Sequence, residues 1–297
     1  MKILLFGKNG QVGWELQRSL APLGELIALD RRSIDLCGDL SNLEGIAAAV
    51  RQIRPDVIVN AAAYTAVDKA ESDTAAARLV NAEAPGALAA AAHSVGAWLV
   101  HYSTDYVFDG SGNRPWHEDD ATGPLSVYGR TKLDGEQRIA ATCPKHLVLR
   151  TSWVYSSRGG NFAKTMLRLA TERDRLTVID DQFGAPTGAD LLADVTSHMV
   201  RSITSGGDGS GGIYHLAAAG ETSWHSYACF VLEQAALASK SLRASPDTVV
   251  AVPTTAFPTP AVRPHNSRLN TAKLRNRFGL HLPAWQQGVA RMLAEIH

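Results

Sequence analysis

Lys2-Ile-Leu-Leu-Phe6-Gly7-Lys-Asn-Gly10-Gln-Val-Gly13 is the stretch that decides the fold of this chain. A short apolar run of the kind found in buried strands leads directly into three glycines spaced G-x-x-G-x-x-G. Glycine permits a tight strand-to-helix turn and leaves backbone N–H groups open to an anion such as a pyrophosphate. Although a glycine-rich turn alone is often only a turn, its place between a strand and a helix predicts a dinucleotide-binding β–α unit.

The first half of the chain continues this alternation of apolar runs and helical patterns. Strands are expected at Lys2–Phe6, Glu25–Leu29, Val57–Asn60, Trp98–Tyr102 and His146–Arg150. Helices are expected near Val12–Leu20, Ser41–Ile53, Ala75–Val95 and Tyr128–Thr142. Ser41 and Glu44 are spaced as a capping box, and Pro55 predicts the end of that helix. The alternation is typical of βαβ units around a parallel sheet.

Beyond about residue 155 the alternation is less regular. Further strands are expected at Leu176–Ile179, Ile213–Leu216 and Thr248–Val252, and further helices at Ala189–Ile203, Ser223–Ala238 and Pro283–Ile296. Gly206–Gly212 is expected to be a flexible loop, and the prolines in Pro253–Pro264 exclude regular helix or central strand. We therefore predict an α/β fold. Residues 1–155 form a Rossmann-type doubly wound parallel sheet to which later segments return, and residues 156–297 form mainly a smaller substrate lobe, with a cleft between.

Composition excludes several classes of function. The chain has 297 residues, 45% of them hydrophobic and 20% charged, with no net charge, so nothing suggests binding to nucleic acid or to an anionic membrane. No signal peptide and no apolar stretch of about 20 residues is seen, and we expect a soluble, cytoplasmic protein. The three cysteines, Cys37, Cys143 and Cys229, are too scattered for a disulfide framework or a zinc site. The histidines lack ligand spacing, and His101, His146 and His215 are expected to be structural.

Several residues after the glycine turn suit a dinucleotide. Asp30 ends the second strand about 20 residues after the glycines, where an acid binds the adenosine ribose hydroxyls. Arg31 and Arg32 follow and could instead hold a 2′-phosphate, so the choice between NADH and NADPH stays open. Asp39 is placed to receive the adenine amino group. The small residues of Asn60–Thr65 suit a loop that packs against the cofactor.

Tyr128 and Lys132 form a Tyr-x-x-x-Lys pair on one face of an expected helix. The phenol could exchange a proton with a substrate oxygen if its pKa were lowered by ~2–3 units, which a nearby ammonium and an oxidised nicotinamide could achieve. Ser103–Tyr106 follows the fourth strand, at the edge where ligands bind in open α/β sheets, and Thr104 would add a hydroxyl hydrogen bond. With the glycine turn, these residues predict hydride transfer to or from a carbonyl.

Trp153 follows the fifth strand and should face the same crevice. A flat ring there can pack on the apolar face of a sugar, while burial in the core is the competing interpretation.

These motifs resemble the extended short-chain dehydrogenases/reductases and, more narrowly, the dTDP-4-dehydrorhamnose reductases. The resemblance covers nearly the whole chain. It rests on Gly7–Gly13, Asn60–Glu71, Ser103–Gly110, Tyr128–Lys132, Arg150–Tyr155, Asp181–Thr187 and Arg263–Leu269. It implies reduction of a 4-keto sugar nucleotide by NADPH or NADH, in the supply of rhamnose for lipopolysaccharide O-antigen.

The resemblance also implies roles for individual residues. Thr104, Tyr128 and Lys132 would form the catalytic set, with Thr104 where the family usually has serine. The dinucleotide would contact Gly7, Gly10, Gln11, Val12, Gly13, Asp30, Arg31, Asp39, Leu40, Ala63, Tyr64, Thr65, Tyr102, Tyr128 and Lys132. The sugar would contact Thr104, Asp105, Tyr106 and Trp153. Tyr64 stands where some members have histidine.

The resemblance further suggests a homodimer in which Glu15, Asp190 and Glu295 hold Mg²⁺ at the contact, although ordinary surface acids would look the same. Three alternatives remain. A sugar 4,6-dehydratase typically carries an Asp-Glu pair where this chain has Asp105-Tyr106. An epimerase usually lacks the Thr-Asp-Tyr loop. A non-catalytic dinucleotide-binding subunit, like the regulatory subunit of methionine adenosyltransferase, would not need Thr104, Tyr128 and Lys132.

Overall fold

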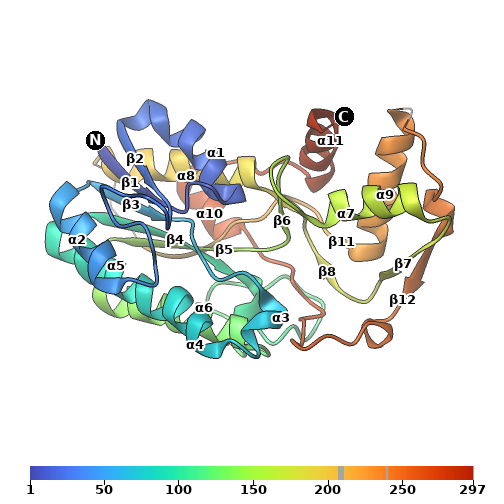
Figure 1. Cartoon of the computed structure of the whole chain (residues 1–297), viewed down its shortest axis with the longest axis horizontal. Coiled ribbons are helices and arrows are strands. Elements are labelled where there is room, and N and C mark those ends of the chain that lie inside the picture. The colour runs from blue at the N-terminus through green and yellow to red at the C-terminus, as the bar shows by residue number, and fades with distance from the viewer. Residues whose placement is uncertain (207–210, 239, 297) are drawn as a thin grey trace.

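A six-stranded parallel sheet forms the centre of the larger lobe of the computed structural model, which describes residues 1–206, 211–238 and 240–296 (Figure 1). Its strands lie in the order β10–β5–β4–β3–β1–β2. Their bounds are Gly212–His215 (β10), His146–Thr151 (β5), Trp98–Thr104 (β4), Val57–Asn60 (β3), Lys2–Phe6 (β1) and Glu25–Leu29 (β2). The predicted Rossmann-type sheet is thus confirmed, and β10 shows that the chain returns to it late.

Helices cover both faces of this sheet. On one face lie α1 (Gln11–Leu20), α8 (Ala189–Thr204) and α10 (Ala272–Phe278). On the other lie α2 (Leu43–Ile53), α5 (Ala84–Val95) and α6 (Val127–Thr142). Alternate residues of β1 explain the arrangement: Ile3 and Leu5 pack under α1 and α8, while Leu4 and Phe6 pack toward α2 and α5.

The smaller lobe has its own hydrophobic core. It contains α7 (Phe162–Glu172), α9 (Trp224–Leu237), α11 (Trp285–Glu295) and the parallel pair β7 (Leu176–Ile179) and β12 (Val249–Val252). Short pairs join β6 (Val154–Tyr155) to β9 (Thr187–Gly188), and β8 (Phe183–Gly184) to β11 (Thr222–Ser223). Figure 1 shows this lobe beyond the carboxyl ends of the sheet strands.

Several predictions about elements were wrong in detail. The expected helix 75–95 is three consecutive pieces: α4 (Thr74–Arg78), a π-helical turn (Leu79–Glu83) and α5. A short helix, α3 (Val67–Ala70), was not predicted. The capping box is wrong because Asn42, not Ser41, caps α2 by accepting from Gly45 N, and the Ser41 hydroxyl donates to Asp39.

Two further expectations have mixed outcomes. The predicted loop Gly206–Gly212 lies partly outside the described residues, while Pro253–Pro264 contains only one 3₁₀ turn, Thr254–Ala256. Within the described residues, no helix is long and apolar enough to cross a membrane.

Candidate functional site

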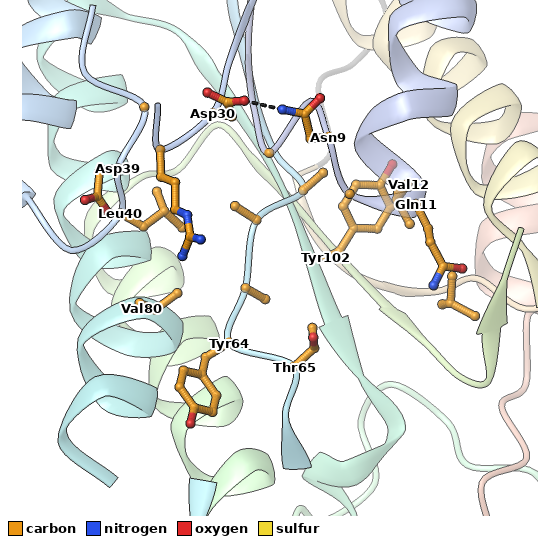
Figure 2. Close-up of a pocket in the computed structure, with 18 of the residues that line it drawn as sticks. Asn9, Gln11, Val12, Asp30, Asp39, Leu40, Tyr64, Thr65, Val80 and Tyr102 are labelled. Carbon is orange, nitrogen blue, oxygen red and sulfur yellow. Dashed lines mark hydrogen bonds between the residues drawn. The ribbon is translucent and has the colours of Figure 1, made fainter. Parts of the chain in front are cut away.

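A cavity of about 1270 Å³ opens at the carboxyl ends of β1, β2, β3 and β4. Its size exceeds that of ordinary small-ligand pockets, which fall at roughly 300–1,000 Å³. Figure 2 shows Asp30 and Asp39 on one side, Gln11, Val12 and Tyr102 on another, and Tyr64 with Thr65 below. All but one of the residues predicted to contact the dinucleotide line it, the exception being Gly13.

The geometry of the glycine turn explains why the cavity opens here and why Gly13 does not line it. Gly7 has φ +89° and lies so close to Ala62 that a Cβ would come within 2.8 Å of its nitrogen. A Cβ on Gly13 would lie 2.0 Å from the Gly7 oxygen, so Gly13 allows α1 to pack on the turn rather than facing the cavity. No side chain caps α1, and its first turn carries no acid. The free N–H groups at the start of α1 therefore favour an anion.

Asp30 lies at one end of the cavity, after β2. Asn9 donates to one of its carboxylate oxygens, and the Arg32 backbone N–H donates to the other at 2.9 Å. The hydrogen bond from Arg32 is the main cause of the lowered pKa of Asp30. Arg31 and Arg32 line the same end with exposed side chains. An acid held in place and two exposed arginines therefore lie together where an adenosine ribose would bind.

The loop after β3 is held by polar contacts from the other side of the cavity. Asn81 accepts from Tyr64 N at 2.8 Å and donates to the Tyr64 carbonyl at 3.0 Å. The Tyr64 hydroxyl donates to Asp73 at 3.0 Å. The loop backbone is thus fixed against the cavity before any ligand binds.

Tyr128 and Lys132 both line the cavity from one face of α6. The Thr104 hydroxyl, which is 5% exposed, hydrogen-bonds with Tyr128, and this bond lowers the pKa of the tyrosine. Lys132 is only 2% exposed and donates to the Tyr102 carbonyl at 2.6 Å. The structure therefore brings the three predicted catalytic residues together at the carboxyl end of β4.

The pKa of Tyr128 is raised in the protein without a nicotinamide, so the lowering that the cofactor's charge could supply stays a prediction. Burial raises the pKa of Tyr128 to about 12, against the opposing hydrogen bond of Thr104. Burial also lowers the pKa of Lys132 to about 8 because it disfavours the ammonium. The physical reason is that desolvation of the phenolate outweighs the hydrogen bond with Thr104. Tyr128 thus holds its proton near neutral pH, as a donor to a carbonyl oxygen must.

None of the four residues predicted to bind the sugar lines the cavity, and three of them, Thr104, Asp105 and Tyr106, lie beside Tyr128. Tyr106 meets Tyr128 edge to face at 5.6 Å between ring centroids. Asp105 is 2% exposed, accepts from the Thr104 hydroxyl at 3.1 Å, and its Oδ2 lacks a well-aligned partner among the described residues. Burial raises the pKa of Asp105 to about 6, with Ser267 and Thr104 opposing. A buried carboxyl with one oxygen that lacks a well-aligned partner among the described residues is suited to a sugar hydroxyl.

Trp153 has a different environment from the one expected. It has φ +50°, and its ring stacks on Trp224 with centroids 3.6 Å apart and planes 14° apart. Gly184 leaves room for the ring, since a Cβ there would lie 2.8 Å from Trp153. Trp224 and Gly184 thus pack on the ring from the smaller lobe, so any contact with a sugar uses only the part that they leave open.

Some residues of the cavity were not predicted. They are Asn9, Gly38, Ser41, Val80, Thr151, Val154 and Arg158. Arg158 lies 3.8 Å from the centroid of the Trp14 ring. Its loop comes from the smaller lobe, far along the chain, and no motif in the sequence indicates that it reaches α1.

The three acids suggested to hold Mg²⁺ at a dimer contact each lie beside an arginine of the same chain. Arg291 lies 3.5 Å from Asp190 and 3.2 Å from Glu295, while Glu15 lies 3.5 Å from Arg18. Across residues 1–206, 211–238 and 240–296, no group of three His, Cys, Asp or Glu side chains could hold a metal ion.

Comparison with known proteins gives one consistent result. The family model described as the RmlD substrate binding domain matches residues 1–297. A protein of Shigella flexneri named dTDP-4-dehydrorhamnose reductase is 62% identical over 296 residues, covering 100% of this chain and 98% of the relative.

Two solved structures that are similar to this chain carry the same name as that relative. A dTDP-4-dehydrorhamnose reductase from Clostridium acetobutylicum superposes with TM-score 0.88 at 36% identity, covering 100% of this chain and 99% of the other. One from Bacillus anthracis, in complex with NADP, gives TM-score 0.86 at 33% identity, covering 99% of each chain.

Proposed function

We propose, from the premise that this chain belongs to the RmlD substrate binding domain family, that it reduces a nucleotide sugar with NADH or NADPH. The reaction converts the C4 keto group of dTDP-4-dehydro-L-rhamnose to the hydroxyl of dTDP-L-rhamnose. The observation that carries the proposal is the site itself: a cavity of dinucleotide size is lined by a partly buried, protonated Tyr128. The bound nicotinamide supplies the hydride.

The residues of this chain supply the remaining chemistry. Tyr128 donates a proton to the C4 oxygen, and the Thr104 hydroxyl, its hydrogen-bond partner, orients the same oxygen. Asp105 and Tyr106 receive the sugar beside Tyr128, with the open part of the Trp153 ring as an apolar wall. Residues 156–297 contribute most of the sugar-nucleotide lobe, while the glycine turn and Asp30 belong to the dinucleotide domain of residues 1–155.

The alternatives fit less well. A dehydratase needs an acid beside Asp105, and that position holds Tyr106, a phenol whose pKa is raised further by burial. An epimerase remains chemically close, but the relatives at 62% identity are named reductases. A non-catalytic subunit gives no reason for Thr104, Tyr128 and Lys132 to meet at the cavity.

The proposal also covers which cofactor the chain prefers, how it assembles and where it is located. NADP in the Bacillus anthracis structure, together with Arg31 and Arg32 beside Asp30, supports use of both cofactors with NADPH somewhat preferred. A homodimer, a cytoplasmic location and Mg²⁺ at Glu15, Asp190 and Glu295 stay predictions. In one copy of the chain, Arg291 already contacts two of those three acids.

The test is NADPH oxidation with the 4-keto sugar nucleotide, measured for the native chain and for Tyr128→Phe. Loss of the proton donor is expected to lower kcat ~10²–10⁴-fold. Tyr227→Phe is the matched control, since that buried hydroxyl in α9 lacks a partner among the described residues. Near-native kcat in Tyr128→Phe would contradict the role of Tyr128, and no oxidation by the native chain would contradict the proposed reaction.

A further inference from the structure

Lys132 has a second buried partner that the proposed chemistry does not use. Its Nζ lies 3.1 Å from His101 Nε2, and both side chains are almost inaccessible, at 2% and 1% exposed. His101 Nδ1 in turn lies 3.1 Å from Asn60 Nδ2. The sequence offered only a structural interpretation of His101. The structure places it in a continuous polar chain from β3 through β4 to the lysine on α6.

The orientation of the Asn60 amide fixes the protonation of the ring. Asn60 Oδ1 accepts from the Ala62 backbone N–H at 3.1 Å, so the amide NH₂ group must face His101. His101 Nδ1 therefore accepts. A neutral imidazole carries one proton, and here that proton must be on Nε2, the nitrogen that faces Lys132.

This arrangement suits a neutral lysine better than a charged one. An amine accepts from the Nε2–H and donates to the Tyr102 carbonyl, with one N–H left over. An ammonium has no lone pair, so one of its N–H groups would meet the Nε2–H head on. If the Asn60 amide were rotated, its oxygen would accept from His101 Nδ1–H and Nε2 would be free to accept from the ammonium. The amide NH₂ would then face the Ala62 N–H, and two donors would meet there. When Lys132 is charged, the chain of Asn60, His101 and Lys132 therefore has one N–H donor more than its acceptors can receive.

We propose that Asn60 and His101 are positioning residues that favour the neutral amine of Lys132 and so set the pH range over which the catalytic ammonium is present. Only the effect on the pH range of catalysis rests on the proposed function, because the protonation of Lys132 can be measured without any reaction. His101 itself stays neutral, since burial and the charge of Lys132 lower its pKa well below the usual value.

Other charged groups near Lys132 do not remove this effect. Glu136, one turn further along α6, favours the ammonium, but it is held by Arg150 of β5 at 2.7 Å. Tyr128 on α6 is protonated, and Asp105, from the turn after β4, acts on Tyr128. Burial is the main cause of the lowered pKa of Lys132. The contact with His101 favours the neutral amine and so acts in the same direction.

The first measurement is the ring tautomer of His101, read from the ¹⁵N chemical shifts of the native protein. The proposal requires the Nε2–H form. An Nδ1–H form, or a protonated ring near neutral pH, would overturn it. This measurement needs no variant and no substrate.

The second measurement is the titration of Lys132, followed by the ¹³Cε shift of labelled lysines, with Lys132→Met to identify the signal. In His101→Gln, the amide can turn its oxygen toward Nζ and accept from the ammonium. We expect the titration of Lys132, about pH 8 in the native chain, to rise by a unit or more, a tenfold gain in proton affinity.

The control is His215→Gln. His215 is also buried, lies on β10 and donates from Nδ1 to the Trp116 carbonyl, outside the cavity lining. This variant should leave the Lys132 titration unchanged. The same upward shift should appear in the alkaline limb of kcat of His101→Gln. An unchanged Lys132 titration in a folded His101→Gln would show that His101 is only structural, whether or not the chain proves to be a reductase.

Discussion

At the scale of single residues, burial is the main cause of the pKa shifts of Tyr128 and Lys132. Tyr128 keeps its proton and Lys132 loses affinity for its own because both are surrounded by protein. The sequence could locate this pair but could not give the sign of the shift for the phenol. That sign depends on how much of α6 and β4 covers the ring, which no motif records.

Asp105 provides a prediction at this scale. Its pKa of about 6 in the folded protein exceeds the ordinary aspartate pKa of 3.8, so the folded protein binds the extra proton between about pH 4 and pH 6. Stability therefore falls as the pH rises through that window, by about 3 kcal/mol at most, and stays lower above it. Asp105→Asn, which keeps an oxygen for Thr104, should raise Tm at about pH 8 and leave it nearly unchanged at about pH 4.

Thermal melts of the native chain and Asp105→Asn at the two pH values check this. The same variant should lose activity, because the free carboxylate oxygen is the proposed partner of the sugar. An equal change of Tm at both pH values would show that the buried charge is not the cause.

At the scale of elements, the sequence located most strands and helices within a few residues. Strands buried on both faces read as continuous apolar runs, and those of the sheet were all found. The failures have local causes. The helix from residue 74 to 95 is interrupted by a π-helical turn in which Asn81 faces the cofactor loop, a tertiary contact with no sequence signal.

The loop after β2 carries the second prediction of this part. Arg31 and Arg32 are exposed beside the fixed Asp30, so a 2′-phosphate would gain a charge-assisted contact that a 2′-hydroxyl cannot. Replacing both arginines with alanine should raise KM for NADPH about tenfold, which corresponds to ~1.4 kcal/mol, and leave KM for NADH nearly unchanged.

Steady-state kinetics with each cofactor measures this difference. Arg51→Ala is a suitable control because that exposed arginine on α2 pairs with Glu44 rather than lining the cavity. Equal effects on the two cofactors would show that Arg31 and Arg32 form only a solvated turn.

At the scale of the whole molecule, polar contacts between the two lobes lie around the site. Gln11 of α1 donates to the Gly160 carbonyl at 3.1 Å, and Arg263 forms a two-point ion pair with Asp68 at 2.7 and 3.0 Å. Asp68 lies on α3, directly after the cofactor loop, and Arg263 follows β12 of the smaller lobe. The sequence contained both residues within recognised motifs, but their pairing joins positions 195 apart.

The last prediction concerns this ion pair. Arg263→Ala should raise KM for the sugar nucleotide several-fold and lower Tm only slightly, because a partly exposed pair contributes about 1 kcal/mol or less. Arg263 lowers the pKa of Asp68, so the contribution of the pair is present at neutral pH and is lost as the pH falls through that lowered pKa. If the pair acts as a unit, the double variant Asp68→Ala/Arg263→Ala should be no worse than either single variant.

The control is a second two-point pair, Arg243 with Asp174 at 2.8 and 2.9 Å, which lies within the smaller lobe and away from the cavity. Arg243→Ala should leave KM for both substrates unchanged. Additive effects of the two single variants at Asp68 and Arg263 would mean that each residue acts alone. A non-additive effect on KM without a matching loss of Tm would show that the contact between the lobes positions the substrate, since the fold would be intact while binding was impaired.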